Sequence, residues 1–301
     1  MLVTMKEILD KAKEGNYAVP APNVFYELET RAVLELAEEL NSPLILDVNP
    51  TFGPAIRELA KEAKVPVAIN LDHGGAYEKC IEAILNGVSS IMVDRSSLPY
   101  EENVAQVKEL VKVAHAGGLS VEAELGHVGQ GEQYDVDGKR AFTVPEEAAN
   151  YVKETGVDAL AVAIGTAHGQ YHGEPKLHFD ILEEITKVVD IPLVLHGGSG
   201  TGFENIGKAC KMGINKVNVN TDLIMGAWAE LKKDIDTKSP YMLYRNICDG
   251  YKNVLRQYME VCGCIGKAWM PEVVGVLNSP MGRYDNRKIE GWFRWRKLQI
   301  G

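Results

Sequence analysis

The sequence has no excess of positive charge and no long apolar run. Its 32 lysines and arginines stand against 42 aspartates and glutamates, which gives a formal net charge of −10. Proteins that bind nucleic acids usually carry a basic patch, so this balance argues against a nucleic-acid partner. The most apolar stretches, such as 157–164, are much shorter than the roughly 18–20 residues of a transmembrane helix. We therefore expect no membrane partner either.

Paired cysteines and a signal segment are also missing. Cysteines stand at positions 80, 210, 248, 262 and 264, an odd number without the spacing of a disulfide scaffold. Reduced thiols are typical of the cytosol. The first 15 residues mix both signs of charge and contain no apolar signal core. These features predict a cytoplasmic protein.

The chain does contain a repeated pattern of short apolar run, polar loop and helical stretch. Each run is rich in valine, isoleucine, leucine or alanine and is too short for an ordinary helix. Eight runs expected to be strands cover residues 17–21, 43–48, 66–71, 89–93, 119–123, 159–164, 191–195 and 214–219. Eight consecutive strand–helix units favour an α/β fold of the (β/α)8 TIM-barrel type over an open doubly wound sheet. Thr143 and Glu146 have the spacing of a capping box at the start of one helix.

The pattern breaks near residue 237. We expect residues 1–236 to form the barrel, and residues 237–301 to form a C-terminal helical extension and tail of the same domain. A helical stretch over 241–262 precedes a tail rich in glycine, proline and aromatic residues. The tail contains three large apolar side chains that we expect to pack against another surface: Trp269, Trp292 and Trp295. The barrel of the same subunit or a second subunit can supply it, and both arrangements fit the sequence.

Polar residues gather at the predicted carboxyl ends of the strands, where (β/α)8 enzymes place their working groups. His73, His168 and His196 follow the third, sixth and seventh predicted strands, each beside a glycine. Three neutral imidazoles are a common ligand set for a catalytic zinc with an open position. Each histidine taken singly could equally be a hydrogen-bonded loop residue. All three follow a predicted strand in the same way, however, and this shared position favours a metal site.

The loops after the seventh and eighth strands are the usual phosphate site of this fold. Gly197, Gly198 and Ser199 offer bare amides and a hydroxyl there, and residues 218–221 add side-chain donors. A metal that binds a ketone oxygen acidifies the adjacent carbon. An open metal site beside a phosphate pocket, with Asp72 next to a ligand, therefore suits reversible aldol chemistry. A Schiff-base mechanism needs a lysine at a strand end, and Lys216 falls near the start of the eighth strand.

Five segments carry motifs that occur together, in this order, in one known family. They read LDHG at 71–74, VEAELG at 121–126, DALAVAIGTAHG at 158–169, LHGGSG at 195–200 and KVNVNTD at 216–222. The set resembles the class II fructose-bisphosphate/tagatose-bisphosphate aldolases over roughly residues 15–235, and more loosely to residue 268. The resemblance implies a TIM-barrel carbon–carbon lyase, a phosphosugar substrate and a homo-oligomer, either a dimer or a tetramer.

The resemblance also implies residue roles. The catalytic Zn²⁺ would be held by His73, His168 and His196, and Asp72 would move a proton at the oxygen of the aldehyde half. Glu132, in the glycine-rich loop 126–137, would act on the carbon of the ketone half. Two acidic residues match positions that hold a second divalent or a monovalent cation, or position the first: Asp94 and Glu124. The residues implied to hold dihydroxyacetone phosphate or its partner are Asn23, Gly169, Gly197, Gly198, Ser199, Asn218, Val219, Asn220 and Thr221.

The chain departs from the family pattern on strands 1 to 4, opposite the predicted phosphate loops. Residues that differ from the common ones are Pro22, Asp47, Asn49, Asn70, Arg95, Ser96 and Ser97. We assign these positions to the pocket for the aldehyde, and we expect an aldehyde that is not necessarily glyceraldehyde 3-phosphate. Arg95 either binds an anionic group on this aldehyde or forms a surface salt bridge.

Two other functions use the same residues. A metal-dependent phosphosugar epimerase or isomerase would need the same metal and phosphate sites, because fold does not fix function. A non-catalytic phosphosugar-binding relative would have lost a metal ligand or Asp72, and this chain keeps both. An aldolase yields two fragments, whereas an epimerase yields one isomer.

Overall fold

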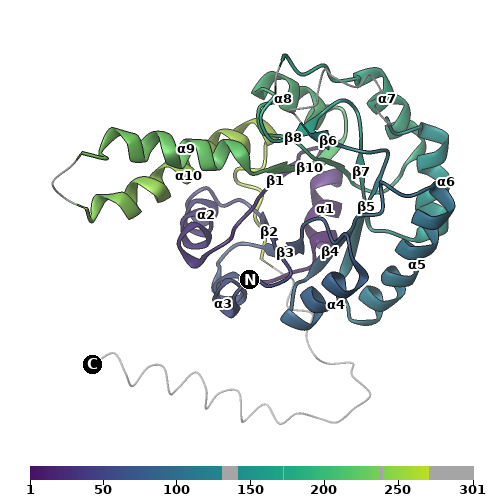
Figure 1. Cartoon of the computed structure of the whole chain (residues 1–301), viewed down its shortest axis with the longest axis horizontal. Coiled ribbons are helices and arrows are strands. Elements are labelled where there is room, and N and C mark those ends of the chain that lie inside the picture. Colours follow the sequence, from purple (N-terminus) through teal and green to yellow (C-terminus); the bar gives the residue numbers. More distant parts are fainter. Residues whose placement is uncertain (131–141, 172, 237–239, 271–301) are drawn as a thin grey trace, which may run out of the picture. The chain divides into compact units, whose positions relative to one another are not determined.

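Eight parallel strands form one sheet that curls into a nearly closed barrel (Figure 1). The computed structural model describes residues 1–130, 142–171, 173–236 and 240–270. The strand order is β1-β10-β9-β7-β5-β4-β3-β2. The bounds are β1 (Val19–Pro22), β2 (Leu44–Val48), β3 (Val67–Leu71), β4 (Ser90–Val93), β5 (Ser120–Leu125), β7 (Ala159–Val162), β9 (Leu193–Leu195) and β10 (Ile214–Val219). Each lies within or overlaps a predicted apolar run, so the barrel prediction is confirmed.

The two edge strands of the sheet, β1 and β2, meet just beyond the end of β1. Asn23 forms a bridge with Asp47, and the Val24 amide donates to the Asp47 carbonyl at 3.0 Å. Every residue of the eight barrel strands is buried. Strands covered on both faces need apolar residues without alternation, and this explains the continuous apolar runs in the sequence.

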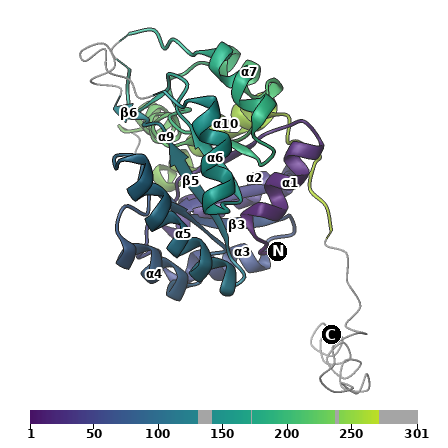
Figure 2. The ribbon, with the colours of Figure 1, turned by 90° about the vertical axis from the view of Figure 1, so that its right-hand side faces the viewer.

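Helices connect successive strands and cover the outside of the sheet. They are α2 (Glu27–Glu39), α3 (Pro54–Glu62), α4 (Tyr77–Asn86), α5 (Tyr100–Ala116), α6 (Pro145–Thr155), α7 (Phe179–Val188), α8 (Phe203–Lys211) and α9 (Thr221–Lys233). Figure 2 shows α5 and α6 side by side outside β5. A separate two-stranded sheet pairs β6 (Gly129–Gln130) with β8 (Ala167–His168).

The first helix, α1 (Met5–Glu14), closes the amino-terminal end of the barrel. Its apolar side chains, including Met5, Ile8 and Leu9, are fully buried. The Lys6 amide donates to the hydroxyl of Ser120, the first residue of β5. The opposite, carboxyl-terminal end is therefore the open one.

Helices α9 and α10 (Met242–Cys262) form a long hairpin that projects from the barrel (Figure 1). Glycine permits their close approach, since a Cβ atom on Gly250 would lie 2.5 Å from the Cα of Ala227. The helix predicted over 241–262 is confirmed. Residues 1–269 form one compact unit, and the tail 271–301 lies outside the described residues. Within the described residues, no helix has both the length and the apolar character needed to cross a bilayer.

The predicted capping box at Thr143 is wrong. Helix α6 begins after Val144, without a side-chain cap. The Thr143 hydroxyl instead donates to the Leu125 carbonyl at 2.5 Å and accepts the Ala163 amide at 2.8 Å. Thr143 therefore joins the ends of β5 and β7, a contact between distant segments that local spacing cannot reveal.

Candidate functional site

A cavity of about 360 Å³ opens at the carboxyl end of the barrel. It lies where the residues predicted to follow the strand ends meet. Its lining contains Asn23, Asp72, His73, Asp94, Glu124, His127, Val128, Gln130, His168, Gly169, His196, Gly197, Gly198, Ser199, Asn218, Asn220 and Thr221. Most of the predicted site residues are thus neighbours in space. His127, Val128 and Gln130 were not among them, although His127 lies in a loop that the sequence placed near the site.

Two predicted residues lie elsewhere, and a third is not among the described residues. Val219 is fully buried in β10 as part of the apolar core, so only its backbone is left to contribute. Glu132 lies outside the described residues. Arg95 is 4% exposed, and its Nη1 donates to the carbonyls of Gly74, Gly75 and Asp94 at 2.7–2.9 Å. Neither role expected for Arg95 fits this position: it is a buried brace for the loop after β3.

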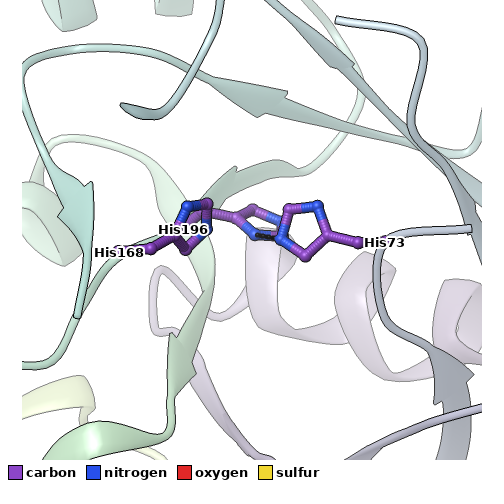
Figure 3. Close-up of side chains that lie close together, drawn as sticks. All are labelled: His73, His168 and His196. Atoms are coloured by element: carbon purple, nitrogen blue, oxygen red, sulfur yellow. Dashed lines mark hydrogen bonds between the residues drawn. The ribbon is translucent and has the colours of Figure 1, made fainter. Parts of the chain in front are cut away.

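The three histidines converge from three strand ends (Figure 3). The ring centroid of His73 lies 4.9 Å from that of His168 and 4.8 Å from that of His196. His73 follows β3 with φ at +48°, a left-handed conformation that costs energy for a residue with a side chain. Gly74 comes next because a Cβ there would lie 2.6 Å from the Met92 carbonyl. The tight turn thus aims the imidazole at the cavity.

Carboxylates fix which nitrogen faces the centre in two of the three rings. Nδ1 of His73 lies 2.8 Å from Asp94, and Nε2 of His196 lies 2.7 Å from Glu122. The opposite nitrogens, His73 Nε2 and His196 Nδ1, face each other at 3.2 Å. Nε2 of His168 is buried without a partner among the described residues. Metal-binding histidines usually bond a carboxylate through their second nitrogen, so this set fits a divalent metal ion.

A second group of possible ligands shares His73. It combines His73 with Asp94 and Glu124, whose ligand atoms lie within 4.8 Å of one another. Burial and the nearby Asp94 charge raise the pKa of Glu124 to about 8, and its Oε2 is buried without a partner among the described residues. A cation would satisfy this oxygen and favour the ionised form.

The proton on His73 makes metal binding depend on pH. Burial lowers the pKa of His73, but the hydrogen bond to Asp94 and the charge of Asp72 outweigh burial and raise it to about 9. Only a neutral imidazole binds a metal, so below about pH 9 the ion must displace this proton. We expect the affinity for a divalent metal ion to increase by about tenfold per pH unit between about pH 6 and 8. Competition with a chelator measures it, and an affinity independent of pH would contradict the assignment of His73.

Asp72 lies beside the histidines with its carboxylate held by two amides. Nδ2 of Asn23 donates to Oδ2 at 2.8 Å, and Nδ2 of Asn218 donates to Oδ1 at 3.2 Å. Burial would raise the pKa of Asp72, but the nearby His73 and His196 lower it below its usual value. The group is therefore an ionised, oriented base at the edge of the histidine cluster.

The loop after β9 approaches β8 and β10 closely enough to require glycine. A Cβ on Gly197 would lie 2.4 Å from the Ala167 carbonyl, and one on Gly198 would lie 2.6 Å from the Asn218 carbonyl. The Ser199 hydroxyl accepts the Asn220 amide at 3.2 Å. Helices α8 and α9 begin just after the loops that follow β9 and β10. Bare amides beside helix amino termini suit a phosphate group.

A buried charged layer lies inside the barrel beneath the cavity. Lys216 Nζ lies 2.9 Å from Glu122 and 3.5 Å from Asp47, and Asn70 donates to Asp47 at 2.8 Å. All four side chains belong to fully buried residues. Asp47 and Asn70 therefore do not form the aldehyde pocket that the sequence suggested. Instead, their layer supports His196 through Glu122.

Removing Lys216 should destabilise the fold strongly, because two buried carboxylates lose their counter-charge. We expect Lys216→Met to reduce the free energy of unfolding by about 3–5 kcal/mol. Chemical denaturation measures this loss. The control is Lys187→Met, which removes an exposed partner of Glu184 and should leave the free energy of unfolding nearly unchanged. Equal small effects in both variants would mean that the buried layer does not stabilise the barrel.

Comparisons with known proteins agree with one another. A family model described as fructose-bisphosphate aldolase class-II matches residues 3–267. The fructose-bisphosphate aldolase of Staphylococcus aureus is 46% identical over 233 residues, which are 73% of this chain and 82% of that protein. The YdjI aldolase from Escherichia coli K12 has a TM-score of 0.81 and 32% identity, with 89% of this chain and 100% of that one covered. The fructose-bisphosphate aldolase from Campylobacter jejuni, at 24% identity and a TM-score of 0.73, supports the fold; the match covers 88% of this chain and 97% of that one.

Proposed function

The chain belongs to the class-II fructose-bisphosphate aldolase family, and from this premise we propose that it cleaves a phosphorylated ketose reversibly into dihydroxyacetone phosphate and an aldehyde. The family consists of carbon–carbon lyases. The observation that carries the proposal is the convergence of His73, His168 and His196 beside Asp72 and the glycine loops. We propose Zn²⁺ as the metal, because three imidazoles with an open position suit this ion.

The chain's own residues would move the protons. A metal bound by the three histidines would act as a Lewis acid toward the ketone half of the substrate. During cleavage, Asp72 would accept the proton of the hydroxyl that becomes the aldehyde oxygen, and the electrons of the broken bond would pass to the carbon of the ketone half. Glu132 would then protonate that carbon. During condensation each proton would move in the opposite direction.

The phosphate of the ketone half would bind at the loops after β8, β9 and β10. Gly169 and Gly197 would offer backbone amides, and Ser199 would offer its hydroxyl. Gly198, whose own amide donates to the Asn218 carbonyl, would let the phosphate approach the backbone closely. Asn218, Asn220 and Thr221, with the backbone of Val219, would complete the pocket. Asn23 would contribute through its hold on Asp72. Asp94 and Glu124 would bind a second divalent or a monovalent cation, or orient His73.

We propose that the aldehyde differs from glyceraldehyde 3-phosphate. Among the sequence departures, Ser96 supports this proposal, because its hydroxyl lies 3.0 Å from Nδ1 of His127 on the cavity lining. Among the described residues that line the cavity there is no lysine or arginine, and Arg95 is used as a loop brace. A neutral polyhydroxyl aldehyde would suit the polar groups of Gln130 and His127 on this lining.

We also propose a homo-oligomer, either a dimer or a tetramer. A groove between α2, α9 and α10 is almost entirely apolar and is lined by residues that include Phe25 and Trp228. Tyr26, which also lines the groove, is 75% exposed, and Trp228 is 44% exposed. Association of two copies would cover such a surface. A cytoplasmic location would suit the five free cysteines.

Product analysis tests the proposed reaction. The protein is offered fructose 1,6-bisphosphate and tagatose 1,6-bisphosphate for cleavage, and dihydroxyacetone phosphate with a panel of aldehydes for condensation. We expect two fragments, or one condensation product, with at least one aldehyde. A single isomer of the ketose phosphate would favour the epimerase, and binding without turnover would favour the non-catalytic relative.

A further inference from the structure

Tyr258 of α10 contacts both loops that form the phosphate pocket. Its hydroxyl lies 2.7 Å from Oδ2 of Asp222, in the first turn of α9, and 3.2 Å from the carbonyl of Gly198, in the loop after β9. Tyr258 itself is only 1% exposed. The cavity lining includes Gly198 and Thr221, so Tyr258 and Asp222 stand directly behind the residues that face the ligand.

The hydroxyl of Tyr258 can donate its single proton to one acceptor at a time. The shorter distance and the charge favour the carboxylate of Asp222. Burial and the Asp222 charge raise the pKa of Tyr258 far above its usual value, so the hydroxyl keeps this proton. The same oxygen of Asp222 also accepts the amide of Gly200 at 3.1 Å. One carboxylate thus joins Tyr258 to the loop after β9.

The two loops also bond each other directly. The Ser199 hydroxyl accepts the amides of Asn220 and Asp222 at 3.2 and 3.1 Å, and the Gly198 amide donates to the Asn218 carbonyl at 3.0 Å. These bonds use some of the groups that are available to hold a phosphate. The bond from Tyr258 comes from outside the pocket, and therefore adds a constraint without occupying a ligand-facing group.

The helix that carries Tyr258 is held firmly against α8, which begins at the same loop. The rings of Tyr258 and Phe203, the first residue of α8, meet edge to face with centroids 5.1 Å apart. One turn further along α10, a Cβ on Gly207 of α8 would lie 3.0 Å from Val261. Cys262 and Cys210 bring their sulfur atoms to 3.9 Å. Tyr258 is therefore attached to a rigid support.

We infer that Tyr258 is a positioning residue for the phosphate pocket: it orients Asp222 and so fixes the register of the two loops that receive the phosphate. The inference rests on the proposed function of these loops. Without the hydroxyl, the Asp222 carboxylate loses one of its hydrogen-bond donors. The carboxylate is then free to turn toward the bound anion and repels it. The affinity for a phosphate ester then falls, while the aldehyde side is left unchanged.

Tyr258→Phe tests the inference, because it removes the hydroxyl and keeps the ring against Phe203. The probe is sn-glycerol 3-phosphate, an unreactive phosphate ester, with binding followed by calorimetry. We expect an affinity about tenfold weaker than that of the wild type, the usual scale for a lost hydrogen bond to a charged group. In the condensation assay, KM for dihydroxyacetone phosphate should rise by a similar factor, with kcat and the KM of the aldehyde within about twofold.

The matched control is Tyr151→Phe. Tyr151 is also fully buried, and its hydroxyl donates to Asn103 at 2.6 Å, away from the phosphate loops. Its variant should bind sn-glycerol 3-phosphate as the wild type does. Equal losses in both variants, or no loss in Tyr258→Phe, would overturn the inference. A wild type that cleaves no ketose but shows the expected binding differences would contradict the proposed reaction and leave the role of Tyr258 intact.

A double variant tests the route through Asp222. If Tyr258 acts by orienting this carboxylate, then Tyr258→Phe should weaken binding by less than about twofold in an Asp222→Ala background. Additive losses would show that Tyr258 acts by another route and would overturn the proposed coupling.

Discussion

The His196→Ala variant is expected to lose its bound metal and its aldol activity together, with activity reduced by more than about a hundredfold. His196 is fully buried, its Nδ1 lies 3.2 Å from Nε2 of His73, and its ring centroid lies 5.8 Å from that of His168. The replacement also removes the partner of Glu122 and leaves this carboxylate with Lys216 alone. Elemental analysis and the cleavage assay measure the two losses on the same preparation.

His115→Ala is the matched control for this variant. His115 also pairs with a carboxylate, Asp158, at 2.8 Å, but it lies beside the amino-terminal end of β5, near Ser120. Its variant should keep the metal and the activity of the wild type. Full activity in a His196→Ala protein that holds no metal would contradict the assignment of His196.

Asp72→Asn should retain the metal but reduce turnover by a factor of about 10² to 10⁴, the scale of a lost general acid or base. The three histidines are unchanged, so metal binding persists. The amide keeps the shape of the carboxylate but cannot accept the proton. It also presents an NH2 group to Asn23 and Asn218, which both donate toward this position. Steady-state kinetics with the substrate that the wild type prefers measure the loss.

Asp158→Asn provides the corresponding control, since it neutralises a carboxylate next to a histidine far from the cavity. We expect turnover within about twofold of the wild type. Turnover at the wild-type level in Asp72→Asn would reassign the proton transfer to another residue, and loss of metal in that variant would make Asp72 a ligand.

The sequence allows good prediction of the barrel and of the residues that face the cavity. Continuous apolar runs identify strands that are buried on both faces, and parallel strands all present their carboxyl ends on the same side. A polar residue directly after a strand therefore has a predictable location. His73, His168 and His196 were found in this way, and so were the glycine loops.

The interior and the supporting contacts could not be predicted in the same way. Asp47 and Asn70 lie within strands, and whether their side chains face the cavity or the charged layer beneath it depends on the packing of Lys216 and Glu122. Arg95 is long enough to reach either solvent or the loop before it, and only the arrangement of three nearby carbonyls decides between them. Tyr258 meets its partners from α10, far along the chain, and no local spacing indicates that contact.

We propose that the histidine cluster holds a metal on which aldol cleavage depends. The most direct test is cleavage by the wild-type protein before and after the metal is removed with a chelator, and again after stoichiometric zinc is restored. We predict that two-fragment cleavage disappears with the metal and returns with zinc, while the fold is retained. Cleavage that continues at an undiminished rate in protein shown by elemental analysis to be free of metal would contradict the account.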